Sequence, residues 1–514
     1  MAILKQVQDA AGPIFELSKY PAMSRVHRDR LQAQGFISQV IPGWYIANRP
    51  GEPPGSSTFW YANMDQFVAA YANSRFGERW QASPEISVLR HSGETGAIRQ
   101  LVVHSPDANN QVLKLPHECS LLLYKVKEET LSPRAALAPS GLRLLALEDA
   151  LVRVSPQFFV SQRLAAQIAM RAVDAIELAR TLLQGHHATI AGRMVGALRA
   201  VGRAEAADDI AATMKAAGHR IVESNPFDCE LPAYDWRENE SPHVQRIRAM
   251  WADMRPAVLD EFAGVPRMDI TNLPAFLKDI EDRYVADAYH SLSIEGFRVT
   301  DDLIRKVRSG SWNPDGDKSD QELYNAMNAR GYYELHHHVV ELIERVLSKG
   351  EPAGEVFRKD FSNWYRTMYG PSVQAGLASA ASLAGYRNIP IYIRNARHVP
   401  PAVEWVRQCM PVFLELMQKE EDAAVRAVLG HFIFVYIHPY QDGNGRISRF
   451  IMNLMLTTGG YRWTIVTVQS RTEYLAALDE ASGDKDIRAF AALLARLARE
   501  QHDQPILRES QRPD

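Results

Sequence analysis

A twelve-residue run, His438 to Arg449 (HPYQDGNGRISR), constrains this chain more than any other part of it. It follows an apolar, helix-compatible stretch, residues 425–437, which is expected to be buried and rigid. Pro439 bars a regular helix from continuing, because it lacks an N–H and disfavours the helical conformation at the residue before it. His438 therefore stands where a rigid element ends and a loop begins. That position suits a general base, since imidazole titrates near neutral pH.

The loop after His438 combines groups that suit the binding of a polyphosphate. Asp442 offers a carboxylate of the kind that Mg²⁺ takes together with phosphate oxygens. Gly443-Asn444-Gly445 lets the backbone approach a ligand closely and turn its N–H groups inward. A second helix is expected to start near Arg446, and the positive end of its dipole adds to an anion site. Arg449 lies three residues further on the same helical face, so both guanidinium groups can fork onto phosphate oxygens.

The run resembles the Fic family signature, H-x-F-x-[DE]-G-N-G-R-x-x-R, with Tyr440 where Phe is usual. In the family this motif joins two helices of an all-α core, and most members transfer AMP from ATP to a hydroxyl side chain of a protein. The resemblance implies that His438 deprotonates a Ser, Thr or Tyr hydroxyl of the target. It further implies that Asp442 holds Mg²⁺ on the α- and β-phosphates and that pyrophosphate leaves.

The resemblance also assigns the rest of the phosphate site. The backbone of Gly443-Asn444-Gly445 and the side chain of Asn444 would form the anion hole. Arg446 would contact the β-phosphate and Arg449 the γ-phosphate. Gly443 and Gly445 argue against the reversed nucleotide of the kinase-like members, while UMP or phosphocholine transfer stays open.

A second segment, Ser291 to Gly296 (SLSIEG), resembles the family's inhibitory motif, [ST]-x-x-x-E-[GN]. It lies before the active-site run, as in the class with an N-terminal inhibitory helix, here near residues 283–296. A Glu295 carboxylate paired with Arg449 would take the cation that should hold the γ-phosphate, and small displacements from attack geometry cost orders of magnitude in rate. The plain reading is a helix C-terminus with a Gly cap. In some members the same glutamate orients a water that removes AMP, so the reverse reaction stays open.

A short strand is expected at residues 389–393, where Ile389, Ile391 and Ile393 alternate with other residues. The resemblance implies a β-hairpin flap here that pairs with the target's main chain, a form of β-augmentation, and that includes Ile391, Tyr392, Ile393 and Arg394. The alternative is an edge hairpin without a partner.

The segment Arg471 to Leu478 resembles the family's helix after the motif. There Tyr474 would lie near the adenine. Leu475 and Ser482 stand where the family often has a second Tyr and an Asn that touches the base, so Ser482 is a candidate nucleotide contact.

Composition is typical of a soluble, cytoplasmic enzyme. The 514 residues suggest two to four domains, and the net charge of −3 provides no global basic field for nucleic acid. The three cysteines form no disulfide framework or zinc spacing. The start of the chain lacks the apolar core of a signal peptide, and no apolar run approaches the ~20 residues of a membrane span.

The chain is expected to divide at a linker, residues 223–243, which is rich in Pro and acidic residues. Residues 244–505 would form the all-α Fic domain. Its predicted helices are residues 244–261, 273–296, 300–308, 321–347, 357–369, 401–419, the two motif helices and 486–501.

The N-terminal half is expected to be α+β. A helix at Val26–Gln34 and a hairpin with its turn at Pro42-Gly43 look like the end of a winged helix, so residues 1–60 are a candidate winged-helix domain. Ser24, Arg25, Arg28 and Arg30 would then face DNA phosphates. Residues 61–222 would form an α+β and helical domain, with a helix at 64–76, strands at 100–104 and 121–126, and helical stretches at 157–183 and 194–217. This arrangement is weakly similar to transcriptional antitoxins of abortive-infection systems. The plain reading is a small α+β domain that recognises a protein or packs against the core.

Two function classes follow from the sequence. The first is a protein adenylyltransferase that uses ATP and Mg²⁺, acts on an unidentified target protein and is held low by Glu295. The second is a DNA-binding regulator or antitoxin-like protein whose Fic half is secondary or modifies only the chain itself. Homodimerisation is common in this class of the family and is an expectation on that ground alone.

Overall fold

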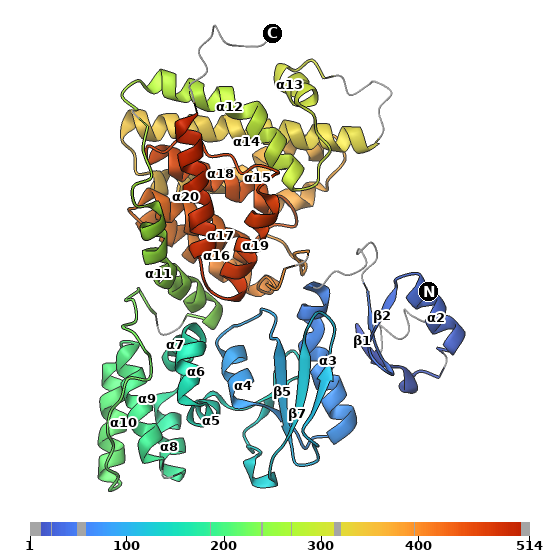
Figure 1. Ribbon diagram of the computed structural model, residues 1–514, viewed down its shortest axis with the longest axis vertical. Helices are drawn as coiled ribbons and strands as arrows, with labels where there is room; N and C mark the ends of the chain where they lie inside the picture. Colours follow the sequence, from blue (N-terminus) through green and yellow to red (C-terminus); the bar gives the residue numbers. More distant parts are fainter. Residues whose placement is uncertain are drawn as a thin grey trace. The chain divides into compact units, whose positions relative to one another are not determined.

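The computed structural model describes residues 12–21, 23–48, 58–185, 187–237, 240–268, 270–312, 320–394 and 396–504. The chain divides into two compact units. Unit 1 comprises Met1–Ala249 together with Tyr392–Val399, and unit 2 comprises Met250–Ile391 and Pro400–Asp514. The expected fold class is confirmed: the described chain is mainly helical, and every strand in it belongs to an α+β N-terminal part (Figure 1).

Unit 1 begins with a small antiparallel sheet and one helix. The elements are β1 (Ile14–Glu16), α2 (Arg25–Ala33), β2 (Ile37–Ile41) and β3 (Trp44–Ala47), and the strand order is β1-β3-β2. Ser24 caps α2 by accepting the His27 N–H, and Gly43 adopts a φ of +86° in the hairpin turn. The predicted helix and hairpin are therefore confirmed, while residues 1–11, 22 and 49–60 of the expected domain lie outside the described residues or in the next helix.

Both faces of this small sheet are buried. Phe15 and Tyr45 pack with Leu31 of α2 on one face. On the other face Trp44 meets Phe67 of α3 (Thr58–Phe76), with ring centroids 5.8 Å apart. This double coverage explains why all four residues of β3 are buried.

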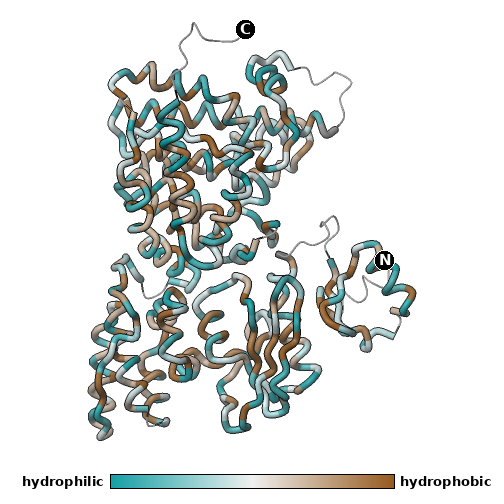
Figure 2. Tube along the Cα trace, in the orientation of Figure 1, coloured by the Kyte–Doolittle hydropathy of each residue, from teal (hydrophilic) through white to brown (hydrophobic). Residues whose placement is uncertain are grey.

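A second sheet follows α3 in unit 1. It contains β4 (Gln81–Ala82), β5 (Gln100–Ser105), β6 (Gln111–Lys114) and β7 (Ser120–Lys125) in the order β4-β5-β7-β6, with α4 (Pro84–His91) after β4. The central pair β5–β7 is parallel, and its alternate side chains are fully buried, as Figure 2 shows by the hydrophobic colour of these strands. Both predicted strands are confirmed. A two-stranded ribbon, β8 (Ala136–Leu137) and β9 (Arg143–Leu144), comes next.

Short helices complete unit 1. They are α5 (Leu147–Arg153), α6 (Pro156–Ser161), α7 (Arg163–Ala172), α8 (Ala175–Gln184), α9 (Ala188–Ala200) and α10 (Ala204–Ala216). Neither helical stretch predicted from the sequence is continuous. The first breaks before Asp174, whose carboxylate caps α8, and the second breaks at Gly202, which has a φ of +84°.

The regular elements of unit 2 among its described residues are all helices, and its predicted helices are confirmed with small shifts of their ends. Helix α11 (Pro242–Phe262) crosses the boundary between the units. The others are α12 (Leu273–Ile294), α13 (Asp301–Ser309), α14 (Asp320–Lys349), α15 (Ala353–Gln374), α16 (Val403–Lys419), α17 (Ala423–Ile437), α18 (Asn444–Thr458), α19 (Arg471–Gly483) and α20 (Arg488–Asp503).

Helices α17 and α18 form the interior of unit 2. Each buries 13 of its 15 residues. In α17 nearly all of the buried side chains are apolar, whereas α18 also buries polar side chains, Arg446 and Arg449 among them. Burying a large side chain such as Phe434 or Ile451 contributes roughly 1.5–3 kcal/mol. The loop between the two helices is therefore held at both ends by a rigid, close-packed pair.

The strand expected at residues 389–393 is not formed. The described residues from 387 to 394 carry no strand. Pro390 has no N–H for a ladder, and Arg387 draws its own segment onto the loop after α17 instead.

In the part of the chain that the structure describes, no helix is both long enough and apolar enough to cross a membrane.

Candidate active site

His438 caps the C-terminus of α17 in the left-handed conformation, with a φ of 52°. That conformation costs a residue with a side chain roughly 1–2 kcal/mol, which the packing of α17 must hold in place. The ring Nδ1 lies 3.1 Å from the Val435 carbonyl. A carbonyl can only accept, so Nδ1 carries the proton and Nε2 carries the lone pair. Burial lowers the pKa of His438 to about 4, and the imidazole is therefore a neutral base at pH 7.

Arg387 fixes the backbone of this base. Its Nε donates to the His438 carbonyl at 2.8 Å, and its own N–H donates to the Pro439 carbonyl at 2.8 Å. The two Nη atoms donate to the carbonyls of Ile389 and Pro401. Burial lowers the pKa of Arg387 to about 10. Sequence reasoning missed this residue, although an arginine just before the expected flap was the available signal.

Tyr440 and Asn444 shape the rest of the loop. The Tyr440 ring stacks on Tyr365 of α15 with centroids 4.0 Å apart. The Asn444 side chain accepts the Tyr440 N–H at 3.0 Å and donates to the Tyr440 carbonyl at 2.8 Å. Both polar atoms of the Asn444 side chain thus hold the loop in this structure, and its part in an anion hole stays a prediction.

The N-terminus of α18 presents backbone N–H groups without helical acceptors. The first helical bond runs from Ile447 N–H to the Gly443 carbonyl, so the N–H groups of residues 444–446 need acceptors from outside the helix. Gly443 has a φ of +81°, and a side chain there would overlap Met368 and Tyr369. The predicted backbone nest is thus present at the predicted place.

Arg446 is held by residues that surround the loop. It donates to Asp442 at 2.9 Å, to the Tyr369 hydroxyl at 2.7 Å and to Asn328 at 2.7 Å. The Phe297 ring lies against its guanidinium, 4.7 Å from centroid to Cζ. Asn328 on α14 and Tyr369 on α15 were not found from the sequence, because nothing local marks a residue that serves an arginine more than 70 positions away.

Asp442 sits at the open edge of this cluster, with its side chain 49% exposed. It accepts the Tyr369 hydroxyl at 2.6 Å and the Gly443 N–H at 2.7 Å. Burial of the carboxyl group would raise its pKa, but the Arg446 charge and these hydrogen bonds lower the pKa of Asp442 below its usual value. The carboxylate is therefore ionised at neutral pH and available to a cation from the exposed side.

Arg449 is held by α12 instead. Its Nε donates to Ser291 Oγ at 2.7 Å, and its Nη2 donates to the Ser291 carbonyl at 3.0 Å and to Glu295 Oε1 at 2.9 Å. The Glu295 side chain is 26% exposed, whereas that of Arg449 is 3% exposed. A methyl group placed on Gly445 would overlap Glu295 Oε1, so this carboxylate lies directly over the N-terminus of α18.

Two buried guanidinium nitrogens keep unused donors. Among the described residues, Arg446 Nε and Arg449 Nη1 have no hydrogen-bond partner. Unpaired buried donors are rare, and a pair of them beside a helix N-terminus is the donor set that an anion satisfies.

The comparisons with known proteins address the same region. Residues 332–456 match the model of the Fic/DOC family, and this range contains the whole loop and both arginines. The sequence of this region is thus similar to that of a Fic/DOC-family domain.

Curated relatives of the Fic domain are adenylyltransferases by name. The chain is 26% identical over 289 residues to protein adenylyltransferase Fic of Nematostella vectensis, covering 54% of this chain and 60% of the relative. It is 28% identical over 223 residues to the Drosophila grimshawi protein of the same name, covering 42% and 41%. The chain thus spans roughly half the length of these relatives.

Among solved structures, similarity is found to Fic-1 from C. elegans, with 20% identity, a TM-score of 0.38, and coverage of 65% of this chain and 89% of that one. A Fic-domain signaling protein from Bacteroides thetaiotaomicron shows 17% identity and a TM-score of 0.37, covering 49% of this chain and 98% of the other. The family relation comes from the sequence matches.

The expected base-contact residues lie on α19, beyond the residues that match the family model. Tyr474 is 2% exposed, and its hydroxyl lies 2.8 Å from Nε2 of the buried His431. The Ser482 hydroxyl donates to the Leu478 carbonyl at 2.8 Å. Both side chains are engaged within the helical core, and their contact with a base stays a prediction.

The residues expected in the target-docking flap fall in different places. Ile391 belongs to unit 2, whereas Tyr392, Ile393 and Arg394 are grouped with unit 1. Within unit 1, the Tyr392 ring meets Phe59 edge to face at 5.5 Å. Nearby, Thr95 Oγ1 donates to the Val399 carbonyl at 2.7 Å, and the Ala97 N–H donates to the Arg397 carbonyl at 2.9 Å. Their docking role stays a prediction.

The half-exposed carboxylate of Asp442 is the group in this loop that suits Mg²⁺. No cluster of three or more His, Cys, Asp or Glu side chains that could hold a metal occurs in the described ranges. Mg²⁺ keeps most of its water and phosphate ligands when one carboxylate binds it. Asp442 fits this mode because it is ionised, exposed on one side and beside the nest of N–H groups.

Proposed function

We propose that this protein is a protein adenylyltransferase that moves AMP from ATP to a Ser, Thr or Tyr hydroxyl of a target protein, and that Glu295 holds this activity low. The observation that carries the proposal is the geometry around His438: a neutral imidazole with a free Nε2, fixed in the loop that leads into a helix N-terminus with two buried arginines.

The proposed chemistry uses these residues in order. His438 Nε2 takes the proton of the target hydroxyl, and the hydroxyl oxygen attacks the α-phosphorus. The bond from the α-phosphorus to the bridging oxygen breaks, and pyrophosphate leaves with that electron pair. Residues 444–446 donate their N–H groups to phosphate oxygens, with Arg446 on the β-phosphate and Arg449 on the γ-phosphate. When bound at Asp442, Mg²⁺ supplies neutralising charge to the phosphates.

Inhibition follows from the place of the Glu295 carboxylate. It takes one Arg449 N–H, and it covers Gly445 where the γ-phosphate side of the nucleotide would approach. ATP that avoids this charge is displaced from the in-line geometry that transfer needs. The same carboxylate lies near enough to the nest to orient a water, which keeps removal of AMP as an alternative reaction of the same site.

Label transfer from α-³²P-ATP with Mg²⁺ tests the proposal. The wild type, Glu295→Gly and Glu295→Gly/His438→Ala are compared with and without cell lysate. We expect label with Glu295→Gly, on the protein itself and on a target band, and at least a ~100-fold loss in the double variant, since a positioned base contributes 10²–10⁴-fold. Glu281→Gly, at an exposed acid of the same helix, is the control and should behave as the wild type.

Unchanged transfer after Glu295→Gly would contradict the inhibitory role, and transfer by the double variant would contradict the role of His438. If the wild type instead releases AMP from protein labelled by Glu295→Gly, the site acts chiefly as a deAMPylase.

A second function is supported by the topology of the described residues between 12 and 48. The order β1-β3-β2 with α2 ahead of the hairpin is compatible with a winged helix. Arg25 and Arg30 are exposed on α2, and both Arg25 and the less exposed Arg28 lie within ion-pair distance of Asp29. We therefore propose that this region binds duplex DNA, as an antitoxin-like regulator would. Binding should weaken steeply with salt and with Arg25→Ala/Arg30→Ala, and a duplex shift that is absent or independent of salt would remove this function.

A further inference from the structure

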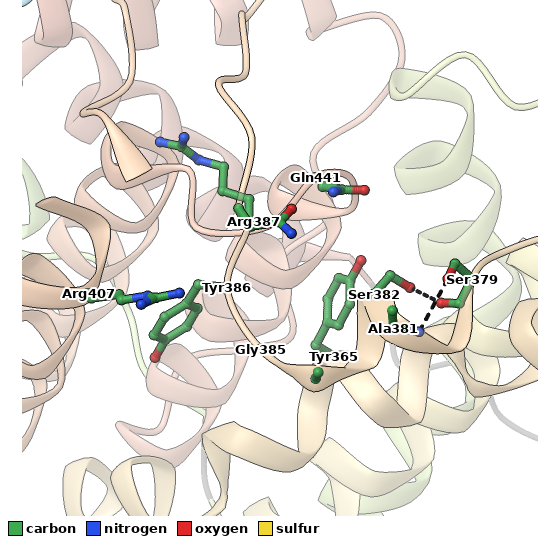
Figure 3. A pocket seen from close by; sticks show the side chains of 11 residues that line it. Tyr365, Ser379, Ala381, Ser382, Gly385, Tyr386, Arg387, Arg407 and Gln441 are labelled. Atoms are coloured by element: carbon green, nitrogen blue, oxygen red, sulfur yellow. Dashed lines mark hydrogen bonds between the residues drawn. The ribbon is translucent and has the colours of Figure 1, made fainter. Parts of the chain in front are cut away.

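A polar pocket lies beside the active-site loop, and its lining does not include the two arginines of the proposed phosphate site. It has a volume of about 430 Å³ and lies entirely within unit 2 (Figure 3). The residues that matter for its chemistry are Tyr365, Ser379, Ser382, Tyr386, Arg407 and Gln441. They come from α15, from the short turn of helix at residues 380–384 and the segment after it, from α16 and from the loop itself.

Two consecutive residues of the active-site loop, Gln441 and Asp442, connect the pocket to the phosphate site. Gln441 lines it, while the next residue, Asp442, binds Arg446 and Tyr369. The loop therefore turns one side chain to the pocket and the following one to the phosphate site. Arg387 also lines the pocket, and its Nε and N–H hold the carbonyls of His438 and Pro439. A group bound in the pocket thus lies against the segment that positions His438.

The charge lining the pocket is positive. Its lining contains no Asp or Glu and two arginines. Arg387 donates its hydrogen bonds to backbone carbonyls, and the Glu404 carboxylate acts on it only through space, without an ion pair. Arg407 is exposed and has no ion pair among the described residues. Glu404, one turn earlier on α16, is exposed and outside the lining.

Two polar groups of the lining, the Ser379 hydroxyl and the Gln441 amide, keep unused donors in the described structure. The Ser379 hydroxyl oxygen accepts the Ala381 N–H at 3.3 Å, and the Ser379 carbonyl accepts the Ser382 hydroxyl at 2.6 Å, which leaves the Ser379 O–H free to donate. The Gln441 amide makes no hydrogen bond to a described residue. Figure 3 shows these serines on one side, Arg407 and Tyr386 on the other, and the Arg387 guanidinium directed away from the serines. A carboxylate satisfies such a set of donors, and the two tyrosine rings provide apolar contact for its methylenes.

We propose that this Arg407 pocket selects the target, by binding an Asp or Glu side chain a few residues from the hydroxyl that receives AMP. This inference rests on the proposed transferase function and adds the substrate class to it. The volume suits one acidic side chain with part of a neighbour, and a nucleotide is bound elsewhere, at the N-terminus of α18.

Synthetic peptides with one Ser, and with Asp, Asn or Lys at each position from −4 to +4, are the probe. Label transfer is measured with Glu295→Gly and with Glu295→Gly/Arg407→Glu, and Glu295→Gly/Arg407→Lys tests rescue. We expect a KM for the best Asp peptide about tenfold below that of its Asn analogue. Arg407→Glu should reverse the preference toward Lys, and Arg407→Lys should restore it toward Asp. Arg305→Glu, at an exposed arginine of α13 outside the pocket, is the matched charge control.

Equal transfer to Asp, Asn and Lys peptides, or an equal loss for all three in Arg407→Glu, would overturn the pocket while leaving the transferase in place. Fluorescence anisotropy with the inactive Glu295→Gly/His438→Ala protein separates the two ideas. Asp-selective binding that Arg407→Glu reverses, without transfer by any variant, supports the pocket and refutes the transferase. Binding without charge preference refutes the pocket.

Discussion

Arg446 and Arg449 leave the same helix one turn apart, yet different parts of unit 2 hold them. Arg446 is bound by Asp442 of the loop, by Asn328 of α14 and by Tyr369 of α15. Arg449 is bound by Ser291 and Glu295 of α12. The Arg446 side of the phosphate site is therefore already held in place, and it is called the built side below. The Arg449 side is covered by Ser291 and Glu295 and is called the masked side; substitutions at these two residues remove no hydrogen bond of Arg446. The predictions that follow change one side at a time.

The largest effect is expected where the two sides meet, at Gly445. A methyl group there overlaps the Glu295 carboxylate and would lie 3.3 Å from Arg449 Nη1, at the N-terminus of α18. In the Glu295→Gly background, Gly445→Ala should lower label transfer at least ~100-fold, because phosphates lose their approach to α18. In thermal unfolding, Gly445→Ala should lower Tm more in the wild type than in Glu295→Gly, where the overlap is gone. Equal Tm losses in both backgrounds would show that Glu295 does not cover this glycine.

The base between the two sides gives the next effect. With a pKa of about 4, His438 stays about 90% neutral at pH 5, whereas an ordinary histidine of pKa near 6.5 would be about 3% neutral. Transfer by Glu295→Gly should therefore persist at pH 5 and be lost as the pH falls through 4. Far-UV circular dichroism at each pH is the control. As the pH falls below 6.5, the unfolded chain protonates the His438 imidazole before the folded protein does, so the stability of the fold decreases. Folded protein that loses activity near pH 6.5 would contradict the assigned state of His438.

A pair of small substitutions should act with opposite signs. Asn328→Ala removes a charged hydrogen bond from the built side, and we expect about a tenfold loss of transfer in Glu295→Gly, as a bond of ~1.5 kcal/mol predicts. Ser291→Ala removes an acceptor from the masked side and should raise transfer by the otherwise wild-type chain a few-fold. Steady-state label transfer measures the activity of both variants. A loss of transfer in Ser291→Ala as well as in Asn328→Ala would show that the two sides of the phosphate site do not act in opposite directions.

The smallest effect is expected at Arg471, whose Nε donates to the Ile294 carbonyl at the end of α12. Arg471→Ala removes this cap next to Glu295 and should raise basal transfer about twofold, since a single backbone hydrogen bond contributes roughly 0.5–1.5 kcal/mol and only part of it bears on Glu295. Arg496→Ala, an exposed arginine of α20, serves as the control. An effect as large as that of Glu295→Gly would mean that Arg471 contributes to the site in another way.

Local patterns predicted much of unit 2. The helix, the proline stop and the glycine nest around His438 follow from residues that are neighbours in sequence, and the contact of Glu295 with Arg449 was expected from a second short motif. Asn328, Tyr369 and Arg387 were missed because each reaches the loop from a distant helix or segment, with no local pattern to mark it.

Other expectations failed because local geometry prevailed over residue pattern. The alternation of Ile389, Ile391 and Ile393 suggested a strand, but Pro390 and the bonds of Arg387 to carbonyls leave no ladder there. The case of Asn444 differs: its role at the ligand stays a prediction from its place in the motif, while its amide bonds the backbone of Tyr440 in this structure. In unit 1, the break at Gly202 was hidden in a sequence rich in Ala and Leu.

The grouping of Tyr392–Val399 with unit 1 bears on how the protein can be dissected. A fragment that starts at residue 250 would keep both arginines, α12 and the base, yet it would strip Phe59, Thr95 and Ala97 from the segment that they pack against. Such a fragment suits nucleotide titration. Its loss of protein labelling would say nothing about the intact chain, because residues 392–399 would have lost the side chains and backbone groups of unit 1 that they contact.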